Sequence, residues 1–361
     1  MFLNNLVYNR TGKQIFNINS YSEKSYFKIY QQLATTIMDS FSSNKTLIKE
    51  NTRDFIFGYL ENDSLGGSAF AYENTDYIYL NCGSILKIHD LFLKLLSNPQ
   101  VFPKIGNFKY SDFTYHKEPI YNNGEEQMVF YNGSSDKTRN DLALQLAYFA
   151  VLYIILHEIG HHFNGHVLLL SSNNLSFSME MTGEQSNIDN LERQTLEMDA
   201  DSFATSNALG FVKNFMENPE SLYFSDHSSA IKHSDILKYW IFSIHCLYLL
   251  QNQQFKYDPT KLKSSFHFPA RLRQLLNHDI TFYVVNLRGY SISKEEYNSL
   301  LSEITSYSEE MFFLTFDIKE TSEDTLNSIN DSVLNQSNRV HEHWNKLKPL
   351  LLEHARSKLA D

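Results

Sequence analysis

A long apolar run that leads into a cluster of histidines constrains this chain more than any other feature. Residues 142–156 read LALQLAYFAVLYIIL, and residues 157–166 follow as HEIGHHFNGH. A helix with so few polar residues belongs in the interior of a protein. Its buried imidazole and carboxylate groups need a partner, and a metal ion satisfies them directly. The stretch therefore predicts a core helix that begins near the polar residues 138–141, continues through residue 166 and carries a metal site.

The composition is that of a globular protein built mainly from helices. Of the 361 residues, 42% are hydrophobic and 14% are aromatic, which separates the chain from disordered sequences. Only 13 glycines and 7 prolines leave few turn signals, so long helices are favoured over a many-stranded sheet. A chain of this length predicts one or two domains with a large core.

Charge, cysteine content and the start of the chain limit the partners and the compartment. The net charge of −11 argues against nucleic acid as the main partner, because phosphate binding needs clustered Lys and Arg. Cys82 and Cys246 do not make a disulfide framework. Residues 1–13 lack the apolar segment of a secretion signal, and the apolar runs at 142–156 and 239–250 are shorter than the ~18 residues of a membrane span. We therefore expect a cytosolic protein with no integral membrane span.

The pattern along the chain predicts an α+β fold that is predominantly helical and has one small β element. Phe70, Tyr72 and the run YIYL at 77–80 are strand formers around the turn residues ENTD, so a β-hairpin is expected within 66–84. Three prolines, Asn-Asn-Gly and Gly-Ser-Ser indicate a loop-rich insertion at about 98–137. Further helices are predicted at 24–42, 86–97, 189–216, 234–252, 259–276 (from loop into helix) and beyond 290.

Two regions are expected, a core at 1–280 and a helical C-terminal extension at 281–361 that packs on it. An amphipathic stripe marks the extension, and such a stripe is more often a packing face than a partner site. Its members are Leu326, Ile329, Val333, Val340, Trp344, Leu347 and Leu351. The sequence HEHWN at 341–345 begins like the main histidine cluster, but Asn345 stands where a second ligand is needed. His341 and His343 are therefore predicted to be surface residues.

Within the main histidine cluster, two residues have the spacing of metal ligands. His157 and His161 lie four residues apart and share one face of a helix. Two imidazoles so placed can supply adjacent corners of a tetrahedral Zn²⁺ site. Glu158 is rotated by one residue, where its carboxylate can reach a water molecule instead of the metal. This is the H-E-x-x-H pattern of two ligands and a general base, and His162 points away from it.

Catalytic zinc keeps three protein ligands and one open position, so a third ligand is required. A third histidine in the pattern H-E-x-x-H-x-x-G-x-x-H is excluded, because Asn164 and Val167 occupy the glycine and histidine positions. The segment 191–209 offers instead Glu197 and Asp201, four residues apart on one helical face with small alanines nearby. Glu197 is the predicted ligand, and Asp201 is the predicted partner of the first histidine's other ring nitrogen.

Alternatives stay open for this second helix. Glu192 and Asp199 are competing carboxylates, although neither shares a face with a partner carboxylate and alanines in the way that Glu197 does. The whole segment can also be an acidic, solvated helix without a metal.

HEIGH at 157–161 and EMDAD at 197–201 together resemble the gluzincin metallopeptidases, and most closely the group of the HtpX-like heat-shock proteases and the CAAX prenyl proteases. Three further segments agree in order. GSAFA at 67–71 resembles the family's N-A-F-A edge strand, and His166 resembles its histidine nine residues after the first ligand. HFPARLR at 267–273 resembles its H-P-x-x-x-x-R segment.

The resemblance covers about 66–276, at motif points only, and the chain departs from the family in several places. Ser68 replaces the Asn of the strand, and one residue is inserted between His267 and Pro269. The insertion at 98–137 enlarges the distance between the strand and HExxH, and the membrane spans of the integral relatives are missing. The chain also resembles the soluble, compact Lit-type phage-exclusion peptidases.

The resemblance implies a gluzincin-like core and a soluble endopeptidase that cleaves a protein or peptide substrate. His157, His161 and Glu197 would hold one Zn²⁺. Glu158 would move a proton from the activated water to the leaving amine.

The same resemblance implies supporting roles for other residues. Asp201 would orient the first histidine, and His166 would support the site or pack against it. His267 and Arg273 would stabilise the oxyanion or anchor the substrate. The residues of the strand that would pair with an extended peptide are Ala69, Phe70 and Ala71.

Two other functions stay open. The chain can be a non-catalytic binding or regulatory module on a peptidase scaffold, with zinc serving structure only. It can also be a stress or phage-defence protease that is switched by a regulatory partner protein, by the insertion at 98–137 or by the C-terminal helices. A binding module differs from a peptidase in leaving the cell's set of protein N-termini unchanged.

Overall fold

The computed structural model describes residues 2–21, 23, 25–42, 53–106, 113–122, 125–172, 177–178, 190–217, 235–255, 268–289, 292–329 and 331–359. The helices are α1 (Phe2–Thr11), α2 (Tyr26–Ser42), α3 (Cys82–Ser97), α4 (Lys137–Phe163), α5 (His166–Ser172), α6 (Asn190–Glu217), α7 (Ile236–Phe255), α8 (Ala270–Leu276), α9 (His278–Leu287), α10 (Lys294–Thr315), α11 (Ser322–Ser328) and α12 (Asp331–Leu352), with a 3-10 turn, η1, at Ile18–Ser20. The strands are β1 (Asp54–Leu60), β2 (Gly67–Tyr72), β3 (Thr75–Asn81), β4 (Phe113–Asn122), β5 (Glu125–Ser134) and β6 (Phe177–Ser178). The prediction of a mostly helical α+β fold is confirmed.

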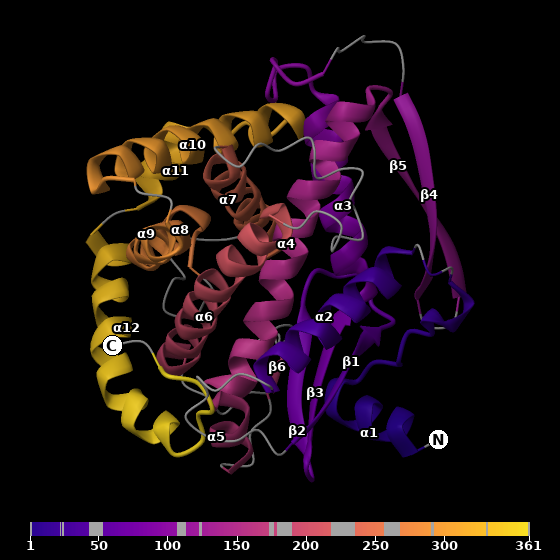
Figure 1. The fold of residues 1–361 in the computed structure, drawn as a ribbon, viewed down its shortest axis with the longest axis vertical. Coiled ribbons are helices and arrows are strands. Elements are labelled where there is room, and N and C mark those ends of the chain that lie inside the picture. The colour runs from indigo at the N-terminus through magenta and orange to yellow at the C-terminus, as the bar shows by residue number, and fades with distance from the viewer. Residues whose placement is uncertain are drawn as a thin grey trace.

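The predicted core helix is α4, which runs through the middle of the molecule with α6 and α7 on one side and α3 on the other (Figure 1). It begins after Asp136, whose side chain accepts a hydrogen bond from the backbone N of Arg139 at 3.0 Å. Among the described residues, α4 alone is long and apolar enough to cross a membrane, but 94% of its apolar window is buried inside the protein. Its apolar side chains therefore build the core.

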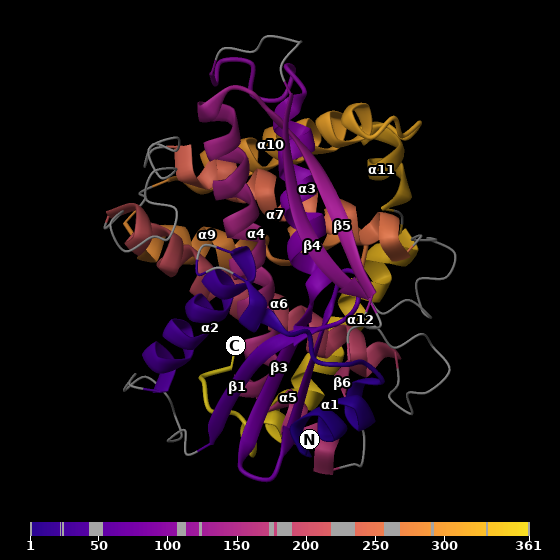
Figure 2. The same ribbon diagram turned by 90° about the vertical axis from the view of Figure 1, so that its right-hand side faces the viewer.

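A four-stranded mixed sheet lies beside α4, with the strand order β1-β3-β2-β6 (Figure 2). β2 and β3 form the predicted antiparallel hairpin, and β1 pairs with β3 in parallel. Side chains alternate along β3. Ile78 and Leu80 face the main core, whereas Tyr77 and Tyr79 pack with Val7 of α1 on the other face. Helices thus cover both faces of the sheet.

The insertion predicted to be loop-rich at 98–137 contains a long hairpin, so that prediction is wrong. β4 and β5 pair antiparallel over ten residues each and pack on α3. Pro119 fits within β4 because both strands of a two-stranded hairpin are edge strands. The Asn-Gly pair at 123–124 is itself a hairpin signal in the sequence.

The helix that carries the histidine cluster ends at Phe163, so the prediction of one helix through residue 166 is wrong. Gly165 has a φ of 87°, a left-handed conformation that commonly ends helices and suits glycine. A Cβ at this position would lie 2.8 Å from the backbone N of Ala355. Glycine therefore also leaves room for residues 353–359, which follow α12 and are called the C-terminal segment below. His166 starts α5 and turns back toward α4 (distances below).

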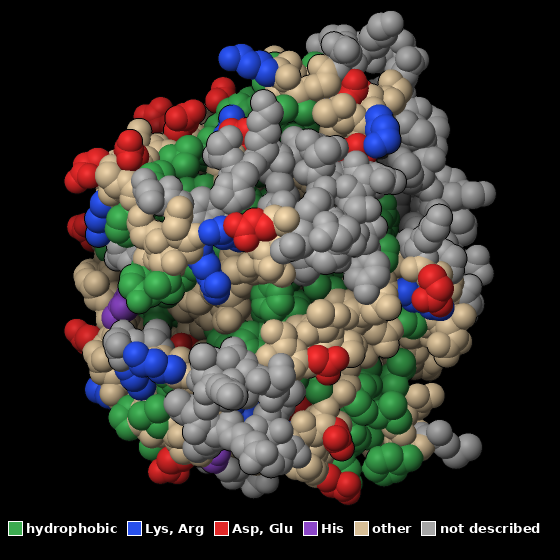
Figure 3. Space-filling model, viewed as in Figure 1, with side chains coloured by type: hydrophobic (Ala, Val, Ile, Leu, Met, Phe, Trp, Pro, Cys, Tyr) green, Lys and Arg blue, Asp and Glu red, His purple; other side chains and the backbone are tan. Residues whose placement is uncertain are grey.

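The C-terminal helices are built into the rest of the molecule. α10 contributes Tyr297, Leu301 and Phe312 to the same hydrophobic core as α4, and α12 packs along α6. Exposed carboxylates gather over α10 and α11 (Figure 3). These surface helices therefore carry part of the chain's negative charge.

The amphipathic stripe is a packing face, as predicted, over most of its length. Its buried members are Val333, Val340, Trp344, Leu347 and Leu351. Leu326 is 47% exposed. It lies on α11, which ends at Ser328, whereas the buried members of the stripe lie on the separate helix α12. His341 is exposed as predicted, whereas His343 is half-buried, with its Nδ1 3.1 Å from Thr195 Oγ1 of α6.

Candidate metal centre

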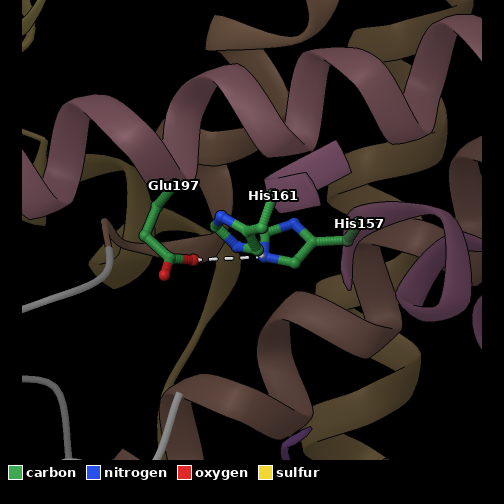
Figure 4. Close-up of side chains that lie close together, drawn as sticks. All are labelled: His157, His161 and Glu197. Carbon is green, nitrogen blue, oxygen red and sulfur yellow. Dashed lines mark hydrogen bonds and ion pairs between the residues drawn. The ribbon is translucent and has the colours of Figure 1, made fainter. Parts of the chain in front are cut away.

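Three buried side chains from two helices converge on one point: His157 and His161 of α4 and Glu197 of α6 (Figure 4). The two Nε2 atoms of the histidines are 3.1 Å apart. His157 Nε2 is 3.3 Å from Glu197 Oε2, and all three ligand atoms lie within 4.8 Å of one another. Ligand atoms on a tetrahedral ion with bonds of about 2.0–2.1 Å lie about 3.3 Å apart. The group is therefore spaced to hold one metal ion.

Small residues let α4 and α6 approach closely at this point. A Cβ added to Gly160 would lie 3.1 Å from the Cβ of Phe203, which is tight. On the facing helix, Ala200 and Ala204 are fully buried. The glycine inside HEIGH and the alanines after Glu197 thus set the distance between the carboxylate and the two imidazoles.

His157 is held through its second ring nitrogen. Its Nδ1 lies 2.9 Å from Asp201 Oδ1, one turn along α6 from Glu197. Because a carboxylate oxygen accepts, Nδ1 donates the proton, and Nε2 can direct its lone pair at a metal. The structure thus places Asp201 where the sequence spacing predicted it.

Arg273 lies behind Asp201 and contacts its carboxylate, while the predicted contact of Arg273 with substrate stays a prediction. Its Nε and Nη2 donate to the two carboxylate oxygens at 2.9 and 2.6 Å, and its Nη1 donates to Gln251. Burial alone would raise the pKa of Asp201, but the charge of Arg273 and the bond from His157 hold that pKa well below its usual range. His267, the other residue predicted for this role, lies outside the described residues.

The second histidine is supported from α5 and α6. His161 Nδ1 lies 2.9 Å from His166 Nδ1, and His166 Nε2 lies 2.9 Å from Asp199 Oδ2. Asp199, which the sequence left open as an alternative third ligand, therefore contacts His166. It does not belong to the ligand group. The other alternative, Glu192, is not in that group either, which consists of the two histidines and Glu197.

The carboxylate of Glu158 is buried next to the ligand group. Among the described residues, neither of its oxygens has a hydrogen-bond partner. A Cβ at Gly67 would lie 3.1 Å from Glu158 Oε1, so the carboxylate lies against the first residue of β2. Burial raises the pKa of Glu158 to about 7, with His157 lowering it and Glu197 raising it further. A carboxyl group with such a pKa can both accept and return a proton near neutral pH.

His162 faces the sheet and points away from the ligand pair, as predicted. Its Nε2 lies 3.1 Å from the carbonyl oxygen of Tyr77, and its Nδ1 lies 3.4 Å from Asp76 Oδ1. Asp76 also pairs with Arg53 at 2.7 Å and with Arg356 at 2.6 Å. This cluster anchors α4, the sheet and the C-terminal segment to one another.

The strand predicted to receive an extended peptide is β2, and its outer edge is partly occupied. Ser68 and Ala69 pair with the two residues of β6. Phe70 and Ala71 lie beyond this short ladder, and within the described residues they pair only with β3. As far as the structure describes the chain, the predicted edge is thus unpaired at Phe70 and Ala71 and paired at Ala69.

Comparison with protein-family models, with curated proteins and with solved structures finds no match to this chain. The fold and the site define its class at a coarse level: a mostly helical α+β protein with a buried His-His-Glu group that could hold a metal ion.

Proposed function

We propose that this protein is a zinc-dependent endopeptidase with a gluzincin-like core, acting on a protein or peptide substrate in the cytosol. The observation that carries the proposal is the ligand group of His157, His161 and Glu197 with the carboxylate of Glu158 buried next to it. Two imidazoles and one carboxylate suit zinc, and three protein ligands are typical of a catalytic zinc site.

The electrostatics of His157 support a cation at this point. Burial alone would lower the pKa of this histidine, but its contacts with Asp201 and Glu197 raise the pKa to about 10. Two carboxylates, one on each side of the ring, thus favour positive charge between them. A divalent ion held by His157, His161 and Glu197 would supply that charge in place of the second proton of the ring.

Each residue of the site has a proposed task. Zinc bound here would lower the pKa of a water molecule to ~7. Glu158 would accept the proton of that water and return it to the leaving amine, which suits a buried carboxyl group with a pKa of about 7. Asp201, itself held by Arg273, would keep His157 in the tautomer that binds metal.

The position of β2 supports an extended peptide as the substrate. The strand begins at Gly67, directly beside the Glu158 carboxylate. A peptide that adds to the edge at Phe70 and Ala71 would run close to the general base, with its backbone held by strand-like hydrogen bonds.

The variant Glu158→Gln tests the proposal, because it keeps the size of the side chain and removes the base. We expect it to bind metal like the wild type and to lose cleavage by a factor of about 10²–10⁴. The measurement compares new protein N-termini in cells that express either protein. A set of N-termini that is present with the wild type and absent with the variant supports the proposal and identifies the substrate. Identical sets contradict it.

The burial of the cluster favours one alternative, a binding or regulatory protein with a structural metal. Structural zinc sites are closed, and here His157, Glu158 and Glu197 are each exposed by no more than 4%. This alternative predicts that Glu158→Gln leaves the N-termini unchanged, whereas removal of the metal lowers the thermal stability. The same N-terminus comparison therefore separates the two functions.

A further inference from the structure

We infer that Asp199 and His166 form a positioning pair that fixes the tautomer of His161 and so presents its Nε2 to the metal. The inference rests on the metal site of the proposed function but not on peptide hydrolysis. Asp201 contacts His157 directly, whereas Asp199 acts on His161 through an intervening imidazole.

The contacts of the positioning pair have one consistent direction of hydrogen bonding. Asp199 Oδ2 lies 2.9 Å from His166 Nε2, and because a carboxylate oxygen accepts, that nitrogen carries the proton. In a neutral His166 the Nδ1 is then an acceptor, and it lies 2.9 Å from His161 Nδ1. His161 Nδ1 therefore donates, which leaves the lone pair of this histidine on Nε2.

The lone pair points where a metal ligand is needed. His161 Nε2 lies 3.1 Å from His157 Nε2, inside the ligand group. The other tautomer would place a hydrogen atom on Nε2 and block ligation, since metals bind the deprotonated nitrogen. His161 and His166 are fully buried and Asp199 is nearly so, so bulk solvent does not compete with the positioning pair for this choice.

Asp199 is itself held in place from the end of α4. Asn164 Nδ2 donates to Asp199 Oδ2 at 2.6 Å, and Asn164 Oδ1 accepts from Ser357 Oγ in the C-terminal segment. The same oxygen of Asp199 thus receives two donors, which keeps it an acceptor toward His166. Each ligand histidine is thus supported by a different carboxylate of α6. Asp201 contacts His157 directly, and Asp199 reaches His161 through His166.

A role in packing and a role in setting the tautomer need different things from residue 166. Packing needs only a side chain of suitable size, whereas the tautomer needs an acceptor next to His161 Nδ1. Asparagine places its amide oxygen near the position of a histidine Nδ1, and leucine has nearly the same shape without an acceptor. His166→Asn and His166→Leu are therefore a matched pair.

The test measures the affinity of the purified full chain for Co²⁺, by the visible absorption of the bound ion, and for Zn²⁺, by competition with a chelator. We expect His166→Leu to weaken binding by about 10- to 100-fold and His166→Asn to retain most of the affinity. His89→Leu is the control, because His89 is a buried histidine of α3 that contacts Tyr26 and Tyr30 but no ligand. Its affinity should equal that of the wild type.

Other outcomes have distinct meanings. If His166→Leu binds as tightly as the wild type, or if the Leu and Asn variants weaken binding equally, the positioning role is overturned and the metal site stands. If the wild type binds neither ion, the metal site of the proposed function fails, and this inference fails with it.

A second measurement needs no substitution. Two-bond ¹H–¹⁵N correlation spectra of the metal-free, histidine-labelled chain report which nitrogen of each ring carries the proton. A proton on Nδ1 of His161 supports the inference. A proton on its Nε2 overturns the inference, whatever the folding of the variants.

Discussion

Five consecutive residues of α6, from Glu197 to Asp201, supply the third candidate ligand and the carboxylates that support both histidines. Glu197 faces the ligand group, Asp201 contacts His157, and Asp199 contacts His166. The residue between the two aspartates is Ala200, which is fully buried and allows the helix to approach α4. One short segment thus sets the charge, the distance and the hydrogen-bond directions of the candidate centre.

Away from this centre, His89 of α3 is a buried histidine that makes the stability of the protein depend on pH. Its ring stacks on Tyr26 with centroids 3.8 Å apart, and its Nε2 lies 3.1 Å from the hydroxyl of Tyr30. Burial lowers the pKa of His89 to about 3, whereas the pKa in the unfolded chain is about 6.5. Between about pH 3 and pH 6.5, the unfolded chain therefore binds a proton at His89 that the folded protein does not bind.

The free energy of unfolding should consequently fall as the pH is lowered from about 6.5 toward 3, by up to ~1.4 kcal/mol per pH unit from this group. The variant His89→Gln removes the titrating ring and keeps a polar group near Tyr30. We expect a smaller loss of stability between pH 6.5 and 5 in the variant, measured by denaturant unfolding at both values. An equal loss in both proteins would show that His89 does not contribute.

At the residue scale, local spacing predicts part of the site well. The i,i+4 geometry of a helix brings His157 to His161 and Glu197 near Asp201 without any knowledge of the fold. The contact of Arg273 with Asp201 could not be predicted in this way, because it depends on how the fold brings α8, which packs on α7, near α6. The contact of Asp199 with His166 depends on the turn at Gly165, which the helical pattern does not reveal.

At the scale of elements, the crossing of α4 and α6 determines whether the three candidate ligands meet. Gly160 faces Phe203 at this crossing, and a side chain there would have to displace the aromatic ring. The Phe203 ring packs against the rings of Phe41 and Phe163, with centroids 5.6 and 6.3 Å away. It has little room to move without moving α6.

Gly160→Val should therefore separate Glu197 from the histidines. We expect a weaker affinity for Co²⁺ and a loss of about 1–3 kcal/mol in the free energy of unfolding from overpacking. Gly210→Val is the control, because the atoms nearest a Cβ at this position of α6 belong to the end of the flexible Arg288 side chain. If both variants bind Co²⁺ like the wild type, the close helix crossing does not set the geometry of the site.

Periodicity and turn residues predict those helices and strands whose sequence pattern lies within one continuous segment. The hairpin of β2 and β3 and the helices α2, α4, α6 and α7 follow from strand formers, turn residues and helical spacing. β1 was not predicted, and its parallel pairing with β3 joins segments that no local pattern links. The hairpin of β4 and β5 was missed because the prolines and glycines of residues 98–137 indicate loops when the strand pairing is not known.

At the scale of the whole molecule, the C-terminal segment closes over the end of the candidate metal helix. The backbone N of Arg356 donates to the carbonyl oxygen of Phe163 at 2.7 Å, and its guanidinium lies 4.7 Å over the ring of the same residue. The helices before this segment share the main core or pack along α6. The C-terminal region therefore supports the site through α4 and α6. Deleting residues 290–361 would remove core side chains as well as any C-terminal helix that switches the activity.

The metal content of the purified chain tests the central claim most directly. Elemental analysis of the wild type, of Glu158→Gln and of Glu197→Gln should give one zinc per chain for the first two proteins. It should give much less for the third, because that variant lacks the carboxylate ligand. A wild type without stoichiometric divalent metal would contradict the account, and so would a Glu197→Gln protein that holds zinc as tightly as the wild type.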